Sequence, residues 1–146
     1  MLPRAQRQIL LHALIVLLVG LLCGAPYGRA ITQGWGEAAV RGWRLAHFSL
    51  IVGGIWLMVV SATLHLLVLG ARGIAILKYS VMTSGYGFTV ALVIGAAGGV
   101  RGLEATGSML NVIAFCGNIS ASVASLVWAV VSIVGVVKAL GQKEAG

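Results

Sequence analysis

The sequence contains very few charged residues. Only 9% of its 146 residues are charged, whereas an ordinary soluble domain has about 25%. Aspartate is absent, so the three acidic residues are all glutamates. Apolar residues make up 60% of the chain, and too few polar side chains remain to cover a soluble globule. Intrinsic disorder is excluded as well, because it requires low hydrophobicity and high charge. We therefore expect an integral membrane protein.

Cysteine and proline are also scarce, with two residues of each. Cys23 and Cys116 both lie inside apolar runs, so we interpret them as buried small residues rather than as a disulfide or a redox pair. No CxxCH motif is present, which excludes a covalently attached c-type haem. With so little proline, we predict no proline kink in any membrane-spanning segment.

Four apolar segments are long enough to cross a bilayer as helices. We predict an all-α, single-domain four-helix membrane bundle over residues 1–146, with spans at 8–26, 43–69, 74–100 and 108–140. The runs are continuously apolar and do not alternate, which argues against a transmembrane barrel. The first run has some features of a signal peptide, and we expect it to be retained as a helix. The last run is long enough to tilt or to extend beyond the bilayer.

The expected connections differ in length. Residues 27–42 contain four glycines and Trp35, and we predict that they form a long interfacial loop with aromatic anchors. Residues 70–73 are expected to form a tight turn, and residues 101–107 the third connection.

The net charge of +7 comes from basic residues at the ends of the apolar runs. This placement indicates topology signals and contacts with the lipid bilayer rather than nucleic-acid binding. Four spans put both termini on one side. That side carries six basic residues against four on the other, which favours a multi-pass protein of the cell inner membrane with cytoplasmic termini. The two groups are Arg4, Arg7, Arg72, Lys78, Lys138 and Lys143, against Arg29, Arg41, Arg44 and Arg101.

Ionisable groups inside a bilayer are costly, so they are candidates for function. The predicted spans contain three histidines and no carboxylate, because Glu37, Glu104 and Glu144 fall in loops or the tail. The absence of a buried acid argues against a proton-coupled transporter.

His47 is the most informative of the three histidines. It follows Trp43 by one turn near the start of the second span, and an imidazole can bind a metal through either ring nitrogen. Gly53 and Gly54 follow it and leave room for a flat cofactor. The alternative interpretation is an interfacial histidine bonded to a backbone carbonyl.

The other two histidines do not complete a site with His47. His65 lies 18 residues later, which places it on the same helix face but about 27 Å along the axis. One haem iron cannot be held by both. A metal site shared by His12 and His65 lacks a visible third ligand, and hydrogen bonding between helices is the simpler account.

The third and fourth spans each carry polar residues on one face. The third span has Tyr79, Thr83 and Tyr86. In the fourth span, the spacing of the polar stripe indicates either a polar pocket or an interhelical seam, and seams are the more common of the two. The stripe consists of Asn111, Phe115, Asn118, Ser122 and Ser125.

The order of these features resembles the styrene oxide isomerase family. The resemblance rests on four spans, Arg7 before His12, Trp43 before His47, and the run Arg101-Gly102-Leu103. It implies a homotrimer of four-helix membrane subunits with haem b at the subunit interfaces. It also implies that His47 is the axial iron ligand and that ferric iron acts as a Lewis acid on an epoxide oxygen. The product is then a carbonyl compound, with no net redox change.

Two positions depart from the family pattern. The family places an asparagine and a tyrosine where this chain has Gly53 and Leu92, so both polar groups that would position the substrate are missing. We name Asn111, Asn118 and Tyr86 as candidate catalytic residues in their place.

The resemblance also suggests which residues surround the cofactor. Trp43 and Gly54 are expected to contact it beside His47. Arg44 and Arg101 are the expected partners of the haem propionates, with Arg41 in reserve, and contact with lipid headgroups is the alternative for all three.

Three hypotheses follow for the function. The first is a haem b-binding isomerase acting on a hydrophobic epoxide-like small molecule. The second is a non-catalytic haem-binding protein that serves in sensing, haem handling or electron transfer. The third is a small structural or transport subunit without a cofactor.

Overall fold

The computed structural model describes residues 2–143, and within that range every regular element is helical. The elements are α1 (Leu2–Leu22), α2 (Gly24–Thr32), α3 (Glu37–Thr63), the 3-10 turn η1 (Leu64–Leu66), α4 (Ala71–Gly98) and α5 (Met109–Lys143). They form four segments that are long and apolar enough to cross a membrane. The prediction of an all-α chain with four spans is confirmed, and the chain is a multi-pass membrane protein.

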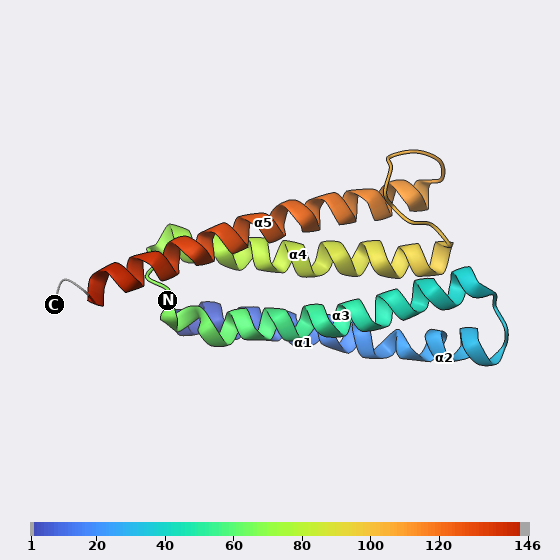
Figure 1. The fold of residues 1–146 in the computed structure, drawn as a ribbon, viewed down its shortest axis with the longest axis horizontal. Helices are drawn as coiled ribbons and strands as arrows, with labels where there is room; N and C mark the ends of the chain where they lie inside the picture. The colour runs from blue at the N-terminus through green and yellow to red at the C-terminus, as the bar shows by residue number, and fades with distance from the viewer. Residues whose placement is uncertain (1, 144–146) are drawn as a thin grey trace.

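The helices are arranged as two antiparallel pairs (Figure 1). Helix α1 packs along α3, helix α4 packs along α5, and contacts of α4 with α3 and α1 join the two pairs. The beginning of α1 and the end of α5 lie at the same end of the bundle, as an even number of spans requires. We call the opposite end, formed by α2, the start of α3 and residues 99–108, the α2 end.

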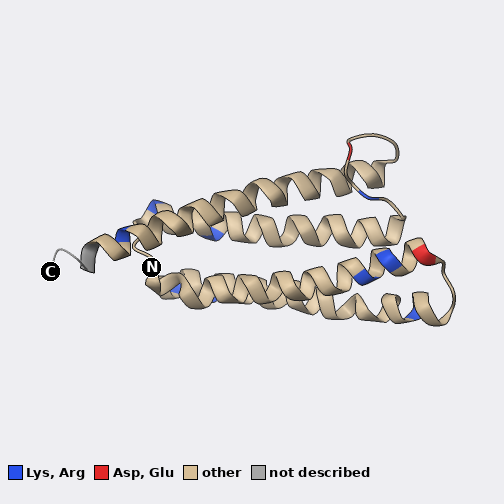
Figure 2. Ribbon diagram, viewed as in Figure 1, with Lys and Arg blue, Asp and Glu red and all other residues tan. Residues whose placement is uncertain are grey.

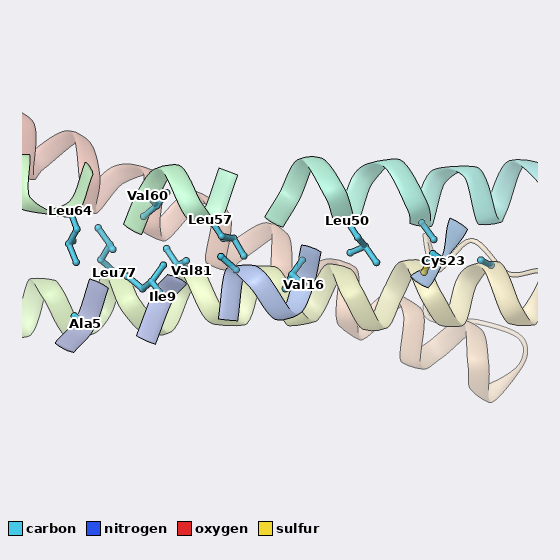
Figure 3. Packing of buried hydrophobic residues seen from close by; sticks show 13 residues of the cluster. Ala5, Ile9, Val16, Cys23, Leu50, Leu57, Val60, Leu64, Leu77 and Val81 are labelled. Atoms are coloured by element: carbon cyan, nitrogen blue, oxygen red, sulfur yellow. The ribbon is translucent and has the colours of Figure 1, made fainter. Parts of the chain in front are cut away.

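The apolar core lies between α1, α3 and α4 (Figure 3). Its largest members with almost no exposed surface are Ile9, Val16, Leu50, Leu64, Leu77 and Val81. The outward faces remain apolar, and side chains such as Leu126 on α5 are 70% exposed. In a bilayer these faces contact lipid, while the backbone polar groups stay bonded within each helix.

Glycines let the helices of each pair approach closely. A Cβ atom built on Gly20 would lie 2.7 Å from the backbone nitrogen of Ile51, and one on Gly54 would lie 2.8 Å from the Cβ of Leu17. Similarly, a Cβ on Gly87 would lie 2.8 Å from the carbonyl oxygen of Gly117. Lipid tails are as apolar as leucine, so tight packing at small residues is a main source of association between membrane helices.

The predicted interfacial loop over residues 27–42 is wrong. Helices α2 and α3 cover most of it, and only residues 33–36 connect them. Just two glycines serve the turn itself, Gly34 with φ of 64° and Gly36 with φ of 90°. Gly42 instead serves helix packing, because a Cβ there would lie 3.2 Å from the Cα of Ala96. A helix satisfies its own backbone near the membrane, so these glycines did not break it.

Two other expectations about the connections are corrected. Helix α1 ends at Leu22 and α2 begins at Gly24, because Pro26 has no N–H to bond the Leu22 carbonyl of a continuous helix. The first helical segment therefore lacks one backbone hydrogen bond near its proline, and it continues to Thr32. The turn expected at 70–73 lies earlier, since α4 begins at Ala71. The Val68 N–H there donates to the Gly135 carbonyl of α5 over 3.1 Å.

The remaining connection and the last helix agree with the sequence. Residues 99–108 link α4 to α5, close to the expected 101–107. Helix α5 has 35 residues, which corresponds to about 52 Å and exceeds the roughly 30 Å of the hydrocarbon layer. Glu144 lies outside the described residues.

We predict that Gly54→Ala destabilises the bundle by about 1–3 kcal/mol, because the new methyl group overpacks the contact with α1. Gly53→Ala is the matched control, since a Cβ there meets no heavy atom within 4 Å. Unfolding in mixed micelles, followed by circular dichroism, measures both. Equal midpoints for the two variants would show that the α1–α3 contact is less tight than described.

Candidate functional site

His47 is held by the backbone of the neighbouring helix. Its Nδ1 lies 2.8 Å from the carbonyl oxygen of Gly20 in α1. A carbonyl oxygen can only accept, so Nδ1 carries the proton and Nε2 carries a lone pair. Among residues 2–143, no hydrogen bond is made to Nε2. The alternative interpretation of His47 expected this carbonyl partner, and the geometry also leaves Nε2 available as a ligand.

The ring of His47 is also fixed on its faces and edge. Tyr27 of α2 stacks on it with centroids 6.1 Å apart and an interplanar angle of 27°. Phe48 meets it edge-on at 5.0 Å. A Cβ atom on Gly24 would lie 3.0 Å from the Cε1 of His47. The first helical segment continues from α1 through Cys23 into α2, so Gly20, Gly24 and Tyr27 meet the imidazole from the same side. Sequence reasoning missed Tyr27, and the Gly20–Gly24 spacing was the one available signal.

A cavity of about 680 Å³ lies between the two helix pairs. Its walls include Phe48, Gly53 and Trp56 of α3, Leu92 of α4, and Trp128 of α5. Nearly all of the lining is apolar, and the volume lies within the range of small-molecule sites. Gly53 and Leu92, the two departures from the family pattern, both face this cavity. His47 itself is not part of the lining, which includes its neighbour Phe48.

The two asparagines of the polar stripe organise the connection between α4 and α5. Asn111 accepts the Gly102 N–H over 2.9 Å and donates to the carbonyls of Glu104 and Thr106 over 2.8 and 2.7 Å. Asn118 donates to the Gly102 carbonyl over 2.9 Å, and it also lines the cavity. Asn111 does not line the cavity, and its partners lie in the loop rather than on another helix, so neither the pocket nor the interhelical seam describes it.

Tyr86 and His12 form a separate pair within the membrane. The Tyr86 hydroxyl lies 2.7 Å from Nδ1 of His12, with the rings edge to face. The pair joins α1 to α4, as expected for an interhelical hydrogen bond, and Tyr86 does not line the cavity. His65 lies just beyond α3, with its Nδ1 2.7 Å from the Ala62 carbonyl. The structure therefore does not bring Tyr86 and the two asparagines together.

No group of three or more His, Cys, Asp or Glu side chains that could hold a metal ion occurs in the described part of the chain. A haem iron differs from a free ion in this respect, because the porphyrin supplies most of its ligands and one histidine can suffice. His65 shares the carbonyl-bonded Nδ1. His47 differs from it because Tyr27 and Phe48 pack against its ring.

The residues expected to contact the cofactor do not all lie around one site. Arg44 and Arg41 line a shallow hollow beside the turn between α2 and α3, and Arg101 is exposed on the loop after α4. All three belong to the α2 end, where basic residues gather as they do at the opposite end (Figure 2). Trp43 is half-buried against the core. The expectation for Gly54 is wrong, because α1 covers it and the open glycine is Gly53.

The sequence was compared with known protein families, curated proteins and solved structures. The sequence profile of the styrene oxide isomerase family matches residues 5–137. The chain belongs to this family. The match covers the body of all four spans, including His47 and the cavity. No curated protein and no solved structure matches the chain.

We predict that Asn111→Ala loosens residues 102–106, because three hydrogen bonds are lost and the loop carbonyls lose their donor. The expected cost is about 1 kcal/mol or more, seen as faster amide hydrogen exchange of that loop in mass spectrometry. Ser120→Ala is the control, since the Ser120 hydroxyl bonds only the Gly117 carbonyl of its own helix. Unchanged exchange in Asn111→Ala would contradict the assigned role.

Proposed function

We propose that this family member binds haem b through Nε2 of His47 and isomerises an apolar epoxide to a carbonyl compound. The hydrogen bond from Nδ1 of His47 to the Gly20 carbonyl carries the proposal. Metal-ligating histidines commonly donate their second ring N–H to a carbonyl, which fixes the tautomer and makes the ligand nitrogen more basic. Membership of the styrene oxide isomerase family supports the reaction class.

Haem b, when bound, would supply a Lewis acid for the epoxide oxygen, so that ring opening and a hydride shift give the carbonyl product with no net redox change. The chain itself has other tasks. Gly20, Gly24 and Tyr27 hold the imidazole in one orientation. The apolar cavity that Phe48 lines would accept the substrate, and its apolar walls would disfavour hydrolysis to a diol.

The polar contacts to the substrate must come from residues other than those of the family pattern. Asn111 is occupied by the loop and Tyr86 by His12. Asn118 lines the cavity and keeps its side-chain oxygen unbonded among the described residues. We therefore assign the contact at the His47 end of the cavity to Asn118.

The assembly and location extend the same proposal. Arg44 and Arg101, at the same end of the bundle as His47, would pair with the haem propionates. A homotrimer with haem at its interfaces would cover part of the exposed apolar surface of each subunit. The excess of basic residues beside the termini supports insertion in the cell inner membrane with cytoplasmic termini.

We predict that the purified protein shows a Soret band and converts styrene oxide to an aldehyde. His47→Gly should lose both, and added imidazole should restore the band because it replaces the missing ligand. His12→Ala is the matched control, since His12 bonds only Tyr86, and it should keep its haem.

Absorption spectra and product analysis give distinct outcomes. A colourless protein whose absorption spectrum shows no Soret band after haemin is added would refute haem binding. A Soret band unchanged in His47→Gly would refute the ligand assignment. Haem without conversion of any aryl or alkyl epoxide would favour the non-catalytic haem-binding alternative.

The packing of α2 against the imidazole gives a second prediction. Gly24→Ala places a methyl group 3.0 Å from Cε1 of His47, so the ring must move. Haem affinity should fall about 10- to 100-fold, as for other changes to groups that orient a ligand. Gly28→Ala, where a Cβ meets nothing within 4 Å, should bind haem normally in a haemin titration. Equal affinities would show that α2 does not orient His47.

A further inference from the structure

A shallow hollow opens on the surface of α1, at the end of the bundle opposite the α2 end. It is lined by Pro3, Arg4, Arg7, Gln8 and Leu11, and we call it the α1 hollow. Arg4 and Arg7 are exposed and precede the predicted start of the first span at residue 8, so they lie at the depth of the lipid headgroups. The α1 hollow shares no lining residue with the cavity between the helix pairs.

The polar side chains of the α1 hollow present hydrogen-bond donors. The guanidinium groups of Arg4 and Arg7 donate and cannot accept. Lys78 of α4 donates to Oε1 of Gln8 over 3.1 Å, so the amide oxygen of Gln8 is engaged and its amide N–H groups remain. The same contact holds the ammonium group of Lys78 beside the hollow and adds to its positive charge. A surface of donors and cations is complementary to an anion.

No carboxylate of residues 2–143 lies at this end of the bundle to balance that charge. Both described glutamates, Glu37 and Glu104, belong to the α2 end (Figure 2). Arg4 and Arg7 are three residues apart and are therefore neighbours on the helix surface, where like charges repel. Anionic lipids attract basic residues at the membrane surface, so a lipid phosphate would relieve this repulsion.

Exposed leucines continue from the α1 hollow along the same face of α1. Leu11, Leu14 and Leu18 follow the two arginines at intervals of three and four residues, which keeps them on one side of a helix. We call them the leucine strip, and they are 44–56% exposed. From Arg7 to Leu18 the helix rises about 16 Å, close to half of the roughly 30 Å hydrocarbon layer. The leucine strip therefore has the depth of one leaflet.

A second copy of this chain is a poorer match for the same face. A copy inserted in the same orientation brings the same end of its bundle to this depth. Among the described residues, that end carries further basic side chains, such as Arg72 and Lys138, and no carboxylate. A second copy would therefore add cations beside the α1 hollow, whereas a lipid phosphate neutralises those already there.

We propose that the α1 hollow and the leucine strip together bind one anionic phospholipid, with its phosphate between Arg4 and Arg7 and an acyl chain along the leucine strip. The net charge of the headgroup decides the selection. Phosphatidylglycerol presents its phosphate without a cation, whereas phosphatidylethanolamine adds an ammonium group that the basic hollow repels. The site lies outside the cavity, so it does not rest on the proposed function.

Lipid titrations followed by native mass spectrometry test the site. The full-length protein in detergent is titrated with phosphatidylglycerol or phosphatidylethanolamine of identical acyl chains. The first phosphatidylglycerol should bind about 10-fold more tightly. Arg4→Gln combined with Arg7→Gln should abolish this preference. Arg72→Gln combined with Lys138→Gln is the matched control and should keep it, because it removes the same charge from the same end of the bundle outside the hollow.

Fluorescence quenching in vesicles locates the bound lipid. Leu14→Trp places an indole on the leucine strip, and its added emission is measured against wild type. In phosphatidylcholine vesicles, phosphatidylglycerol brominated on its acyl chains should quench this emission more strongly than an equal fraction of brominated phosphatidylethanolamine. Removal of Arg4 and Arg7 by the same glutamine substitutions should make the two lipids equal.

The proposal is overturned if wild type prefers neither lipid, or if the preference survives the loss of Arg4 and Arg7. Loss of the preference in the control variant as well would also overturn it, because general surface charge would then explain the binding. Displacement of phosphatidylglycerol by inorganic phosphate would refute a lipid site in favour of a site for a free anion. If neither brominated lipid quenches Leu14→Trp, a second copy covers the leucine strip and the proposal is wrong.

Discussion

The close approach of α1 and α3 is the constraint on which the candidate site depends. Gly20 and Gly54 bring the two backbones into contact, and only at that separation can the Gly20 carbonyl reach the imidazole of His47. The same helical segment continues into α2, where Tyr27 stacks on the ring. Residues that bring two helices into contact therefore also decide which nitrogen of His47 is free.

The sequence was a good guide to the fold because the strongest signal in a membrane protein is apolar length. All four spans and the shared side of the termini followed from it. The prediction of a loop at 27–42 was wrong because it rested on glycine content. A helix near the membrane loses little stability from glycines that allow close packing. The first span was expected to end at Pro26, whereas the helical segment continues past it to Thr32.

The candidate site was only partly predictable. His47 stood out because an ionisable side chain inside a span needs a reason. The groups that hold its ring, the Gly20 carbonyl and Gly24, could not be recognised in the same way, because a backbone carbonyl and a glycine do not alter the pattern of polar and apolar residues. Asn111 and Tyr86 were plausible by residue type, yet their bonds to the loop and to His12 depend on tertiary contacts.

The division of the bundle into two hairpins has a consequence for how the cavity can vary. The cavity lies at the seam between the hairpins, so its width is set by how they dock rather than by any single helix. The His12–Tyr86 bond spans that seam from α1 to α4. Such a bond acts as a spacer, and exchanging it for a shorter or longer pair would resize the cavity without touching its lining. In this architecture, substitutions at residues that do not contact the ligand can change the range of ligand sizes that the cavity accepts.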